Sequence, residues 1–417
     1  MPFRPLVLGS VLGIVIFGSP GLAAEPSVAV EKLAAPAESQ VEATDVRVGG
    51  DTKQTRFVVD LSRKVDIATF TLADPYRVVV DLPQVAFKLP PHAGERGRGL
   101  IKAFRYGLIM QGGSRIVLDV SGPVRVEKAF TLGETDGQPA RLVLDLTPTD
   151  RTAYLRDMGL AARQVHRPTH ANTDTAQADS DPRPLVVIDP GHGGPDSGTK
   201  GLDGQDEKDV VLAFGLKLRE ALEKSGKYRV SMTRRDDTFI PLTERVHIAR
   251  QLKAALFISI HADSVPRKEG QAEGASVYTL SEHASDAEAG RLAEEENKSD
   301  IIAGVDLSAE PDDVANILID LAQRETKTFS MQFARTVIGD IKPVAPLHIH
   351  PVKSAGFIVL KAPDVPSVLV ELGYMSTRRD LKNLISDDWQ TKTAAAMGRA
   401  VDDFFAKRLV GANVGAK

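Results

Sequence analysis

From residue 185 onward, short apolar runs alternate with stretches of helical periodicity, and this alternation restricts the fold more than any other feature of the chain. The strands expected from the apolar runs are 185–189, 228–233, 255–261, 274–280, 357–360 and 367–371. The helices expected between and after them are 206–225, 241–252, 311–339 and 387–407. Continuous apolar strands are buried on both faces. The pattern therefore predicts an α/β domain over 185–410, with an open, mostly parallel sheet flanked by helices.

The region before it, 45–148, has a repeated strand pattern without helices. Arginine, three apolar residues and aspartate recur four times, beginning at Arg56, Arg77, Arg115 and Arg141. Such runs between Gly, Pro and Asp are typical of strands bounded by turns. Their irregular spacing excludes a solenoid and predicts an all-β sandwich. Arg and Asp either pair across neighbouring strands or contribute to a binding module, and the sequence favours pairing as the role of these charges.

Two further segments complete the organisation of the chain. Residues 149–184 are small, polar and aperiodic, which predicts a flexible linker, so His166 and His170 within it are not expected to bind metal. Residues 1–24 combine Arg4, an apolar run at 6–17 and small residues up to Ala24, as a secretory signal does. The run is too short for a bilayer of about 30 Å. We therefore expect an exported chain without a stable membrane span, with an uncleaved anchor as the alternative.

Cysteine and charge counts narrow the chemistry. The chain has no cysteine, which excludes disulfides, a thiol nucleophile and a Cys-ligated metal, and leaves nine histidines and the carboxylates as metal ligands. The net charge of −4 provides no basic field for nucleic acid, which is not an expected partner.

Potential ligands stand at three strand ends and one helix start. His192 follows the first strand of the α/β domain, His261 ends another strand, Glu371 ends a third, and Glu207 opens the first helix. Ligands of open α/β sheets bind beyond the carboxyl ends of the strands, so these four groups should converge. Two histidines and one glutamate suit zinc with an open position for water, as in a catalytic site.

Each residue also has an ordinary structural explanation. A histidine at a strand end can simply be hydrogen-bonded, Glu207 can favour a helix N-terminus, and Glu371 can pair with an arginine such as Arg245. All four explanations would have to hold at one edge of the sheet, so the site remains the stronger interpretation.

The motifs themselves resemble a known family. The segments 187–198, 234–242 and 257–263, together with Glu207, Arg245 and 370–376, resemble the zinc-dependent N-acetylmuramoyl-L-alanine amidases (amidase_3) of bacterial cell division. Residues 45–148 resemble the AMIN domain, a β-sandwich that binds peptidoglycan and helps to place such enzymes at the septum. The resemblance implies a periplasmic enzyme that splits septal wall during daughter-cell separation.

The resemblance also implies roles for individual residues. His192, Glu207 and His261 would hold one Zn²⁺, and Glu371 would be the catalytic acid/base. The bond cleaved would be the amide between the lactyl group of N-acetylmuramic acid and L-alanine of the stem peptide. Asp263 could reach the metal or orient Glu207 or His192 from one layer out. Arg245 is a further candidate for such an outer contact. We expect a monomer.

Residues 281–325 form an insertion that the sheet does not require, with thirteen acidic and three basic side chains. Ala289, Leu292, Ala293 and Glu296 have helical spacing, so Glu296 falls on an apolar face and should face a cation. Glu294 and Glu295 are the alternatives if the helical phase differs. A second helix is expected to open at Pro311, with an apolar stripe at residues 314–322 that joins the core or serves regulation.

The segment 292–297 resembles the regulatory helix of amidases whose active site is blocked until an activator binds. By that resemblance Glu296 occupies the open zinc position, and an activator with a degenerate lysostaphin-like domain docks on 281–325. Two other functions stay open: a zinc hydrolase of another wall bond, and an inactive wall-binding or activator protein. Retention of all four site residues argues against the inactive protein.

Overall fold

The computed structural model describes residues 40–110, 112–135, 137–161, 181–264, 272–305 and 317–414. The expected signal segment, His166, His170, Pro311 and Val314 lie outside these ranges. Within them, no helix is both long and apolar enough to cross a bilayer.

The N-terminal region is built from strands, as predicted. The strands are β1 (Val41–Gly50), β2 (Thr55–Leu61), β3 (Ala68–Leu72), β4 (Arg77–Pro83), β5 (Val85–Phe87), β6 (Ile101–Ile109), β7 (Gly113–Val120), β8 (Val124–Leu132) and β9 (Ala140–Pro148). One sheet has the order β5-β1-β2-β9-β8, and the other has the order β12-β6-β7-β4-β3, in which β12 is Thr238–Phe239. Apolar side chains from both sheets, such as Phe57 and Ile116, form one buried core. This is the predicted sandwich.

The repeated Arg and Asp residues do pair across strands. Nε of Arg56 on β2 lies 2.6 Å from Asp145 on β9, and Nε of Arg115 on β7 lies 2.6 Å from Asp81 on β4. The structural explanation of the repeat is confirmed for these pairs. Asp119 pairs instead with Arg105.

The predicted linker begins with a helix, α1 (Arg151–Ala161). Tyr154 is buried in the core of the sandwich and donates its hydroxyl hydrogen to the carbonyls of Leu72 and Arg77. The expectation of flexibility from residue 149 was therefore wrong for this helix. The helix has no clear apolar face, because a single residue, Tyr154, makes its buried contact. Periodicity therefore did not indicate it.

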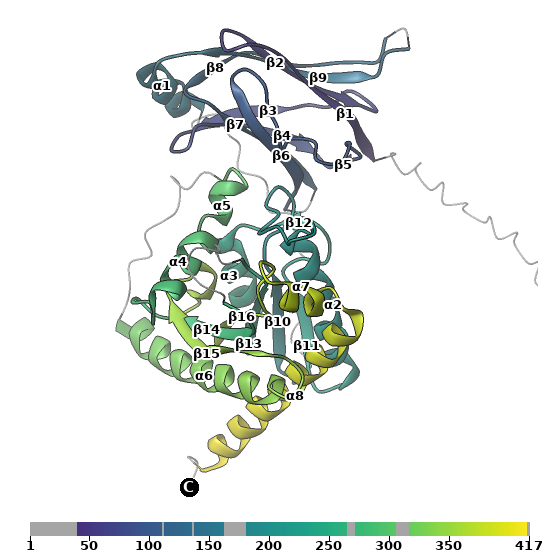
Figure 1. Cartoon of the computed structure of the whole chain (residues 1–417). Helices are drawn as coiled ribbons and strands as arrows, with labels where there is room; N and C mark the ends of the chain where they lie inside the picture. The colour runs from purple at the N-terminus through teal and green to yellow at the C-terminus, as the bar shows by residue number, and fades with distance from the viewer. Residues whose placement is uncertain are drawn as a thin grey trace, which may run out of the picture. The chain divides into compact units, whose positions relative to one another are not determined.

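The C-terminal region is the predicted α/β domain (Figure 1). Its sheet has the order β11-β10-β13-β16-β14-β15, with all neighbours parallel except β14 and β16. The strands are β10 (Leu185–Pro190), β11 (Arg229–Met232), β13 (Leu256–His261), β14 (Ala275–Leu280), β15 (Leu347–Ala355) and β16 (Ser367–Glu371). The helices are α2 (Glu207–Lys224), α3 (Leu242–Gln251), α4 (Ala287–Glu296), α5 (Ser299–Ile302), α6 (Ile317–Ile341), α7 (Arg378–Leu384) and α8 (Asp387–Val414).

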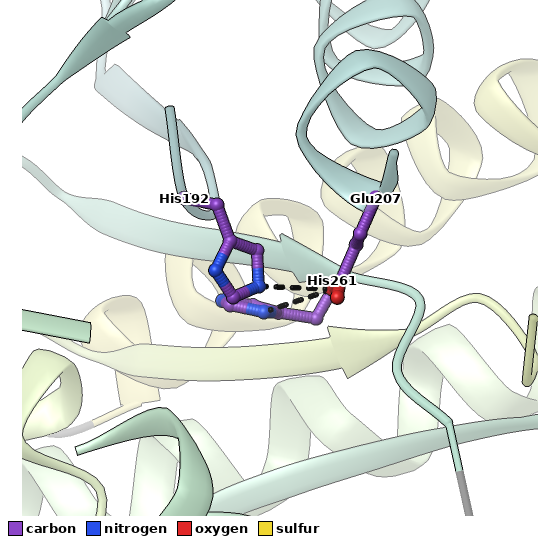
Figure 2. A group of neighbouring side chains, drawn as sticks. All are labelled: His192, Glu207 and His261. Atoms are coloured by element: carbon purple, nitrogen blue, oxygen red, sulfur yellow. Dashed lines mark ion pairs between the residues drawn. The ribbon is translucent and has the colours of Figure 1, made fainter. Parts of the chain in front are cut away.

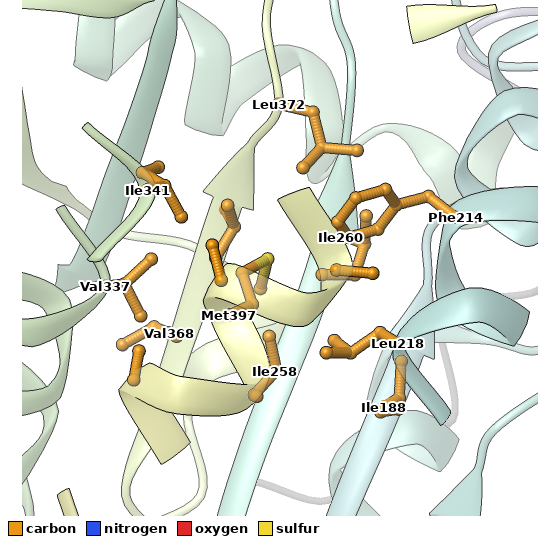
Figure 3. Close-up of a cluster of buried hydrophobic side chains, with 14 of the residues drawn as sticks. Ile188, Phe214, Leu218, Ile258, Ile260, Val337, Ile341, Val368, Leu372 and Met397 are labelled. Atoms are coloured by element: carbon orange, nitrogen blue, oxygen red, sulfur yellow. The ribbon is translucent and has the colours of Figure 1, made fainter. Parts of the chain in front are cut away.

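Both faces of this sheet are covered. Ile188, Ile258 and Val368 pack with α2, α6 and α8 on one face, and Figure 3 shows this cluster around Phe214 and Met397. Val187, Phe257 and Leu369, the neighbours of those strand residues, pack on the other face with α3 and α4. Alternate residues of each strand thus serve opposite layers, which explains why the strands read as continuous apolar runs.

One expected strand in this domain was wrong, and two elements were missed. Residues 358–360 form a 3₁₀ helix, Ile358–Leu360, rather than a strand, and the strand β15 was missed. β15 is an edge strand that contains Pro351 and several polar residues, so it has no apolar run. Helix α7 was also missed, because it is short and largely polar.

Candidate metal centre

Three side chains from separate elements meet at the carboxyl edge of the sheet. His192 follows β10, Glu207 is the first residue of α2, and His261 is the last residue of β13; one ligand atom from each lies within 4.8 Å of the others. Glu207 Oε1 is 3.2 Å from His192 Nε2 and 3.3 Å from His261 Nδ1. Figure 2 shows the two rings and the carboxylate directed at one another. Three of the four groups expected to converge thus lie together.

The facing atoms suit a metal ion. His192 Nε2 and His261 Nδ1 are buried and have no hydrogen-bond partner among the described residues. Ligand atoms around a tetrahedral ion with bonds of about 2.0–2.2 Å lie about 3.3–3.6 Å apart, close to the separations observed here. The three groups are thus consistent with holding one metal ion.

The backbone before His192 brings the ligands close. His192 has φ of 59°, and a Cβ on the preceding Gly191 would lie 2.3 Å from Cε1 of His261. Any side chain at residue 191 would therefore displace the second histidine. The sharp turn after β10 requires glycine because the two ligand loops are in contact.

Each of two ligands is oriented by further hydrogen bonds. His192 Nδ1 lies 2.9 Å from Oδ2 of Asp196, while Glu207 accepts backbone N–H bonds from Ala262 and Thr199 at 2.8 and 3.0 Å. Such contacts fix ring orientation and ligand basicity. Sequence analysis missed Asp196, although its position four residues after His192 in a glycine-rich loop was a usable signal.

Arg245 does not pair with Glu371. It is buried, lies 2.8 Å from Asp189, and donates to the backbone carbonyls of Pro190 and His192 at 2.8 Å. The ordinary explanation offered for Glu371 was therefore wrong. Arg245 acts on the loop of His192 through its backbone.

Glu371 faces the same edge, opposite His261 in the β13–β16 ladder. Its Oε2 accepts the backbone N–H of Asp263 at 3.0 Å, and its Oε1 has no hydrogen-bond partner in the described part of the chain. Burial, followed by the charges of Asp263, Glu207 and Glu296, raises the pKa of Glu371 well above its usual value. A raised pKa suits a carboxyl group that exchanges protons with a reactant.

Asp263 lies beside Glu371 rather than within the metal cluster. Its Oδ2 has no hydrogen-bond partner among the described residues. Burial and then the charge of Glu207 raise its pKa well above the usual value. The backbone N–H of Asp263 contacts Glu371, and Asp263 does not orient the ring of His192.

The insertion places Glu296 at the same centre. The buried residues of α4 are Ala289, Leu292, Ala293 and Glu296, the face predicted from their spacing. Glu296 Oε2 lies 3.1 Å from His261 Nδ1 and 3.7 Å from His192 Nε2. Glu294 and Glu295 are exposed, so the helical phase selects Glu296.

Residues that follow α4 hold it against the domain. Asn297 donates to the carbonyl of Gly356 at 2.9 Å and accepts from the backbone N–H of Ile358 at 2.8 Å. Ser299 donates to Asp196, and Asp300 accepts the backbone N–H of Leu242 at 2.9 Å. Together these contacts close the site around the three candidate ligands.

The electrostatics of the closed site favour a bound cation. Burial acts to lower the pKa of His192, but the charges of Glu207, Asp196 and Glu296 outweigh it and raise that pKa well above its usual value. Burial acts to raise the pKa of Glu207, and His192 and His261 reverse this effect. Buried carboxylates need compensation. A divalent ion between the histidines would supply it.

An α/β sheet with a buried His, Glu and His at its carboxyl edge and a nearby glutamate defines a metal-dependent hydrolase. The family model described as N-acetylmuramoyl-L-alanine amidase (Amidase_3) matches residues 186–403, and the AMIN domain model matches 45–146. The chain belongs to this amidase family, which confirms the predicted family, enzyme class and fold class.

Relatives match over both regions. The N-acetylmuramoyl-L-alanine amidase AmiC of Escherichia coli O6:H1 is 34% identical over 91% of this chain and 93% of its own length. AmiC of Neisseria meningitidis serogroup B is 30% identical over 87% of this chain and 89% of its own length. Among solved structures, amidase AmiC2 of Nostoc punctiforme is 29% identical, covering 54% of this chain and 97% of that chain, with a TM-score of 0.38.

Proposed function

We propose that the chain is a periplasmic zinc amidase that splits septal peptidoglycan and is autoinhibited by α4. Its bond is the amide between the lactyl group of N-acetylmuramic acid and L-alanine of the stem peptide. The observation that carries the proposal is the joint placement of His192, Glu207, His261 and Glu371 at one edge of the sheet. Export by residues 1–24, wall binding by 45–148 and a monomeric state complete the proposal.

His192, Glu207 and His261 hold the metal, and Glu371 performs proton transfer. Zinc bound there would polarise the scissile carbonyl and bring the pKa of water down to about 7. Glu371, whose Oε1 is free of hydrogen bonds among the described residues, accepts the proton of the attacking water and delivers it to the leaving amine nitrogen. Asp263 positions Glu371 through its backbone N–H, and Arg245 positions the His192 loop.

Autoinhibition follows from where Glu296 lies. Its carboxylate faces both histidine nitrogens, at the side where a water or a substrate carbonyl would have to approach. A docked α4 therefore excludes substrate. An activator with a lysostaphin-like domain would bind 281–325 and draw α4 away.

The test compares full-length variants on purified sacculi, with zinc content measured for each. Glu371→Ala should retain zinc and lose hydrolysis, and activity that survives would contradict its role. Glu296→Gln should raise basal hydrolysis, whereas Glu295→Gln, on the exposed side of the same helix, should not. Deletion of 283–325 should raise it further; a folded, zinc-loaded deletion without any rise would refute autoinhibition.

The products distinguish the remaining enzyme class. Amidase action releases stem peptides with an unblocked L-alanine amine, whereas a deacetylase releases acetate. An inactive wall-binding protein would release neither. The intact His-Glu-His cluster favours a hydrolase over an inactive protein, and the family match favours the amidase.

A further inference from the structure

The first turn of α4 carries a second carboxylate, Glu288, which contacts buried groups from β15 and from the loop after β16. Glu288 Oε2 lies 2.9 Å from Nζ of Lys353, and Glu288 Oε1 accepts the hydroxyl hydrogen of Tyr374 at 2.9 Å. Nε2 of His348 lies 3.6 Å from the same carboxylate. Lys353, His348 and Tyr374 are 3%, 7% and 1% exposed. These three side chains are thus buried while α4 is docked, and Glu288 contacts them from the start of that helix.

Lys353 and Tyr374 present hydrogens to Glu288, and an imidazole nitrogen of His348 lies nearby. The ammonium of Lys353 and the hydroxyl of Tyr374 are donors, and the latter is used here. Nδ1 of His348 lies 3.0 Å from the backbone nitrogen and 3.1 Å from the carbonyl oxygen of His350, which leaves Nε2 on the side of Glu288. A hydroxyl donor and an ammonium on one carboxylate, with an imidazole beside them, suit the recognition of a carboxylate.

The ion-pair partners of Lys353 come from α4. In the described ranges, its ion-pair partners are Glu288 and Asp286, the latter at 3.6 Å, and both stand at the start of this helix. Departure of α4 would remove both of these partners. The Lys353 ammonium would then be available to another anion.

The side chains around Glu288 and the metal centre lie at opposite ends of α4. Glu288 and Glu296 are eight residues apart on α4, which is about 12 Å along a helix. Tyr278 on β14 lies opposite Lys353 on one side and opposite Leu369 on the other, so the three side chains share a face of the sheet. Glu371 is two residues after Leu369, and because side chains alternate along a strand, it lies on this same face. α4 packs against β15 there (Figure 1). A ligand that replaced α4 would reach both ends.

We propose that Lys353, Tyr374 and His348 form a subsite for a carboxylate of the stem peptide, and that Glu288 occupies it while α4 is docked. The inference rests on the proposed function, because α4 must leave for a peptide amide to bind. An extended peptide advances about 3.3–3.6 Å per residue, so roughly 12 Å corresponds to three or four residues beyond the scissile amide. α4 thus imitates the substrate at two points, at the metal and at this carboxylate.

Two substitutions remove one partner each of the ion pair between Lys353 and Glu288. They distinguish two explanations of the pair: a substrate subsite, or a contact that only holds α4 in place. Both substitutions are made in the full-length, zinc-loaded chain that carries Glu296→Gln. Lys353→Gln removes the subsite, whereas Glu288→Gln removes only its occupant. Each is assayed with a muropeptide bearing free stem carboxylates and with the same muropeptide carrying carboxamides there.

The expected result is a loss of discrimination with Lys353→Gln alone. Its KM for the acid should rise about 10- to 100-fold, the range for a hydrogen bond to a charged group, with a much smaller change in kcat. Glu288→Gln should keep the preference for the acid over the amide, and Lys353→Arg should restore most of it. Equal discrimination by the Gln variants at 353 and 288 would show that the pair only fastens α4, and would overturn the subsite.

Failure of the proposed function gives a different result. If the parent hydrolyses neither muropeptide, binding of the free tetrapeptide and of its amide is measured by calorimetry instead. A preference for the acid that Lys353→Gln abolishes would support the subsite. A parent that binds acid and amide equally would refute it. If Lys353→Gln does not fold, Tyr374→Phe removes one donor oxygen. That variant should raise the KM, or the dissociation constant, for the acid but not for the amide, and an equal change for both would overturn the proposal.

Discussion

Ser299 donates its hydroxyl hydrogen to Oδ2 of Asp196, the same oxygen that lies 2.9 Å from Nδ1 of His192. The segment that follows the proposed inhibitory helix is therefore bonded to the side chain that orients a proposed metal ligand. The carboxylate of Asp196 therefore both holds the segment that closes the site and orients His192.

Ser299→Ala should release α4 in part. The loss of a hydrogen bond to a charged acceptor, worth about 1.5–3 kcal/mol, should raise basal hydrolysis of sacculi about tenfold or more in the absence of an activator. Ser281→Ala is the matched control, since its hydroxyl accepts a bond from the nearby backbone of His283. Equal rates for the two variants and the unaltered chain would mean that Ser299 does not hold α4.

Asp196→Ala should weaken metal binding. His192 would lose the carboxylate on Nδ1, and losses of this kind reduce metal affinity about 10- to 100-fold. Competition with a chromophoric chelator measures the change in zinc affinity. Asp203→Ala, at an exposed position of the same region, should leave it unaltered. Unchanged affinity in the Asp196 variant would show that the ring is oriented by the backbone alone.

Gly191→Ala should disrupt the metal centre. The new methyl group would lie within 2.8 Å of three ring atoms of His261, so one ligand loop must move. We expect at least a tenfold loss of zinc affinity, because a catalytic zinc site depends on three protein ligands. Gly339→Ala is the control: its Cβ meets nothing within 4 Å, and alanine there should favour α6 slightly. Normal zinc content in the Gly191 variant would contradict the contact.

Asp145→Asn should destabilise the sandwich in a pH-dependent way. The hydrogen bond from Arg56 lowers the pKa of Asp145, so its contribution to stability is present above the unfolded pKa of about 3.9 and is lost as pH falls through the lower folded pKa. Hydrogen exchange of β2 and β9 should therefore be faster in the variant at pH 7. The difference from the unaltered chain should shrink in acid. A difference that stays constant with pH would exclude the ion pair as its cause.

Much of the fold could be predicted, because its signals are local. The apolar runs of β10, β13 and β16 show burial on both faces, and the residues that end them fall at the edge where ligands bind. The four residues on the buried face of α4 could be predicted from their spacing in the same way.

What escaped prediction depends on contacts across long stretches of chain. β15 lacks an apolar run because it lies at the sheet edge, and α1 is anchored mainly by Tyr154. Asp196, Glu288 and Lys353 are ordinary surface residues by type, and their roles follow from burial that the sequence does not reveal.

The pairing of His261 with Glu371 across β13 and β16 has a consequence for control of the enzyme. Opposite residues of a sheet keep their separation as long as the strands remain hydrogen-bonded. His261 and Glu371 would therefore keep their relative positions if α4 left the site. Under the proposed autoinhibition, an activator would only have to uncover these groups, and the rate of wall cleavage would follow the fraction of molecules that are uncovered.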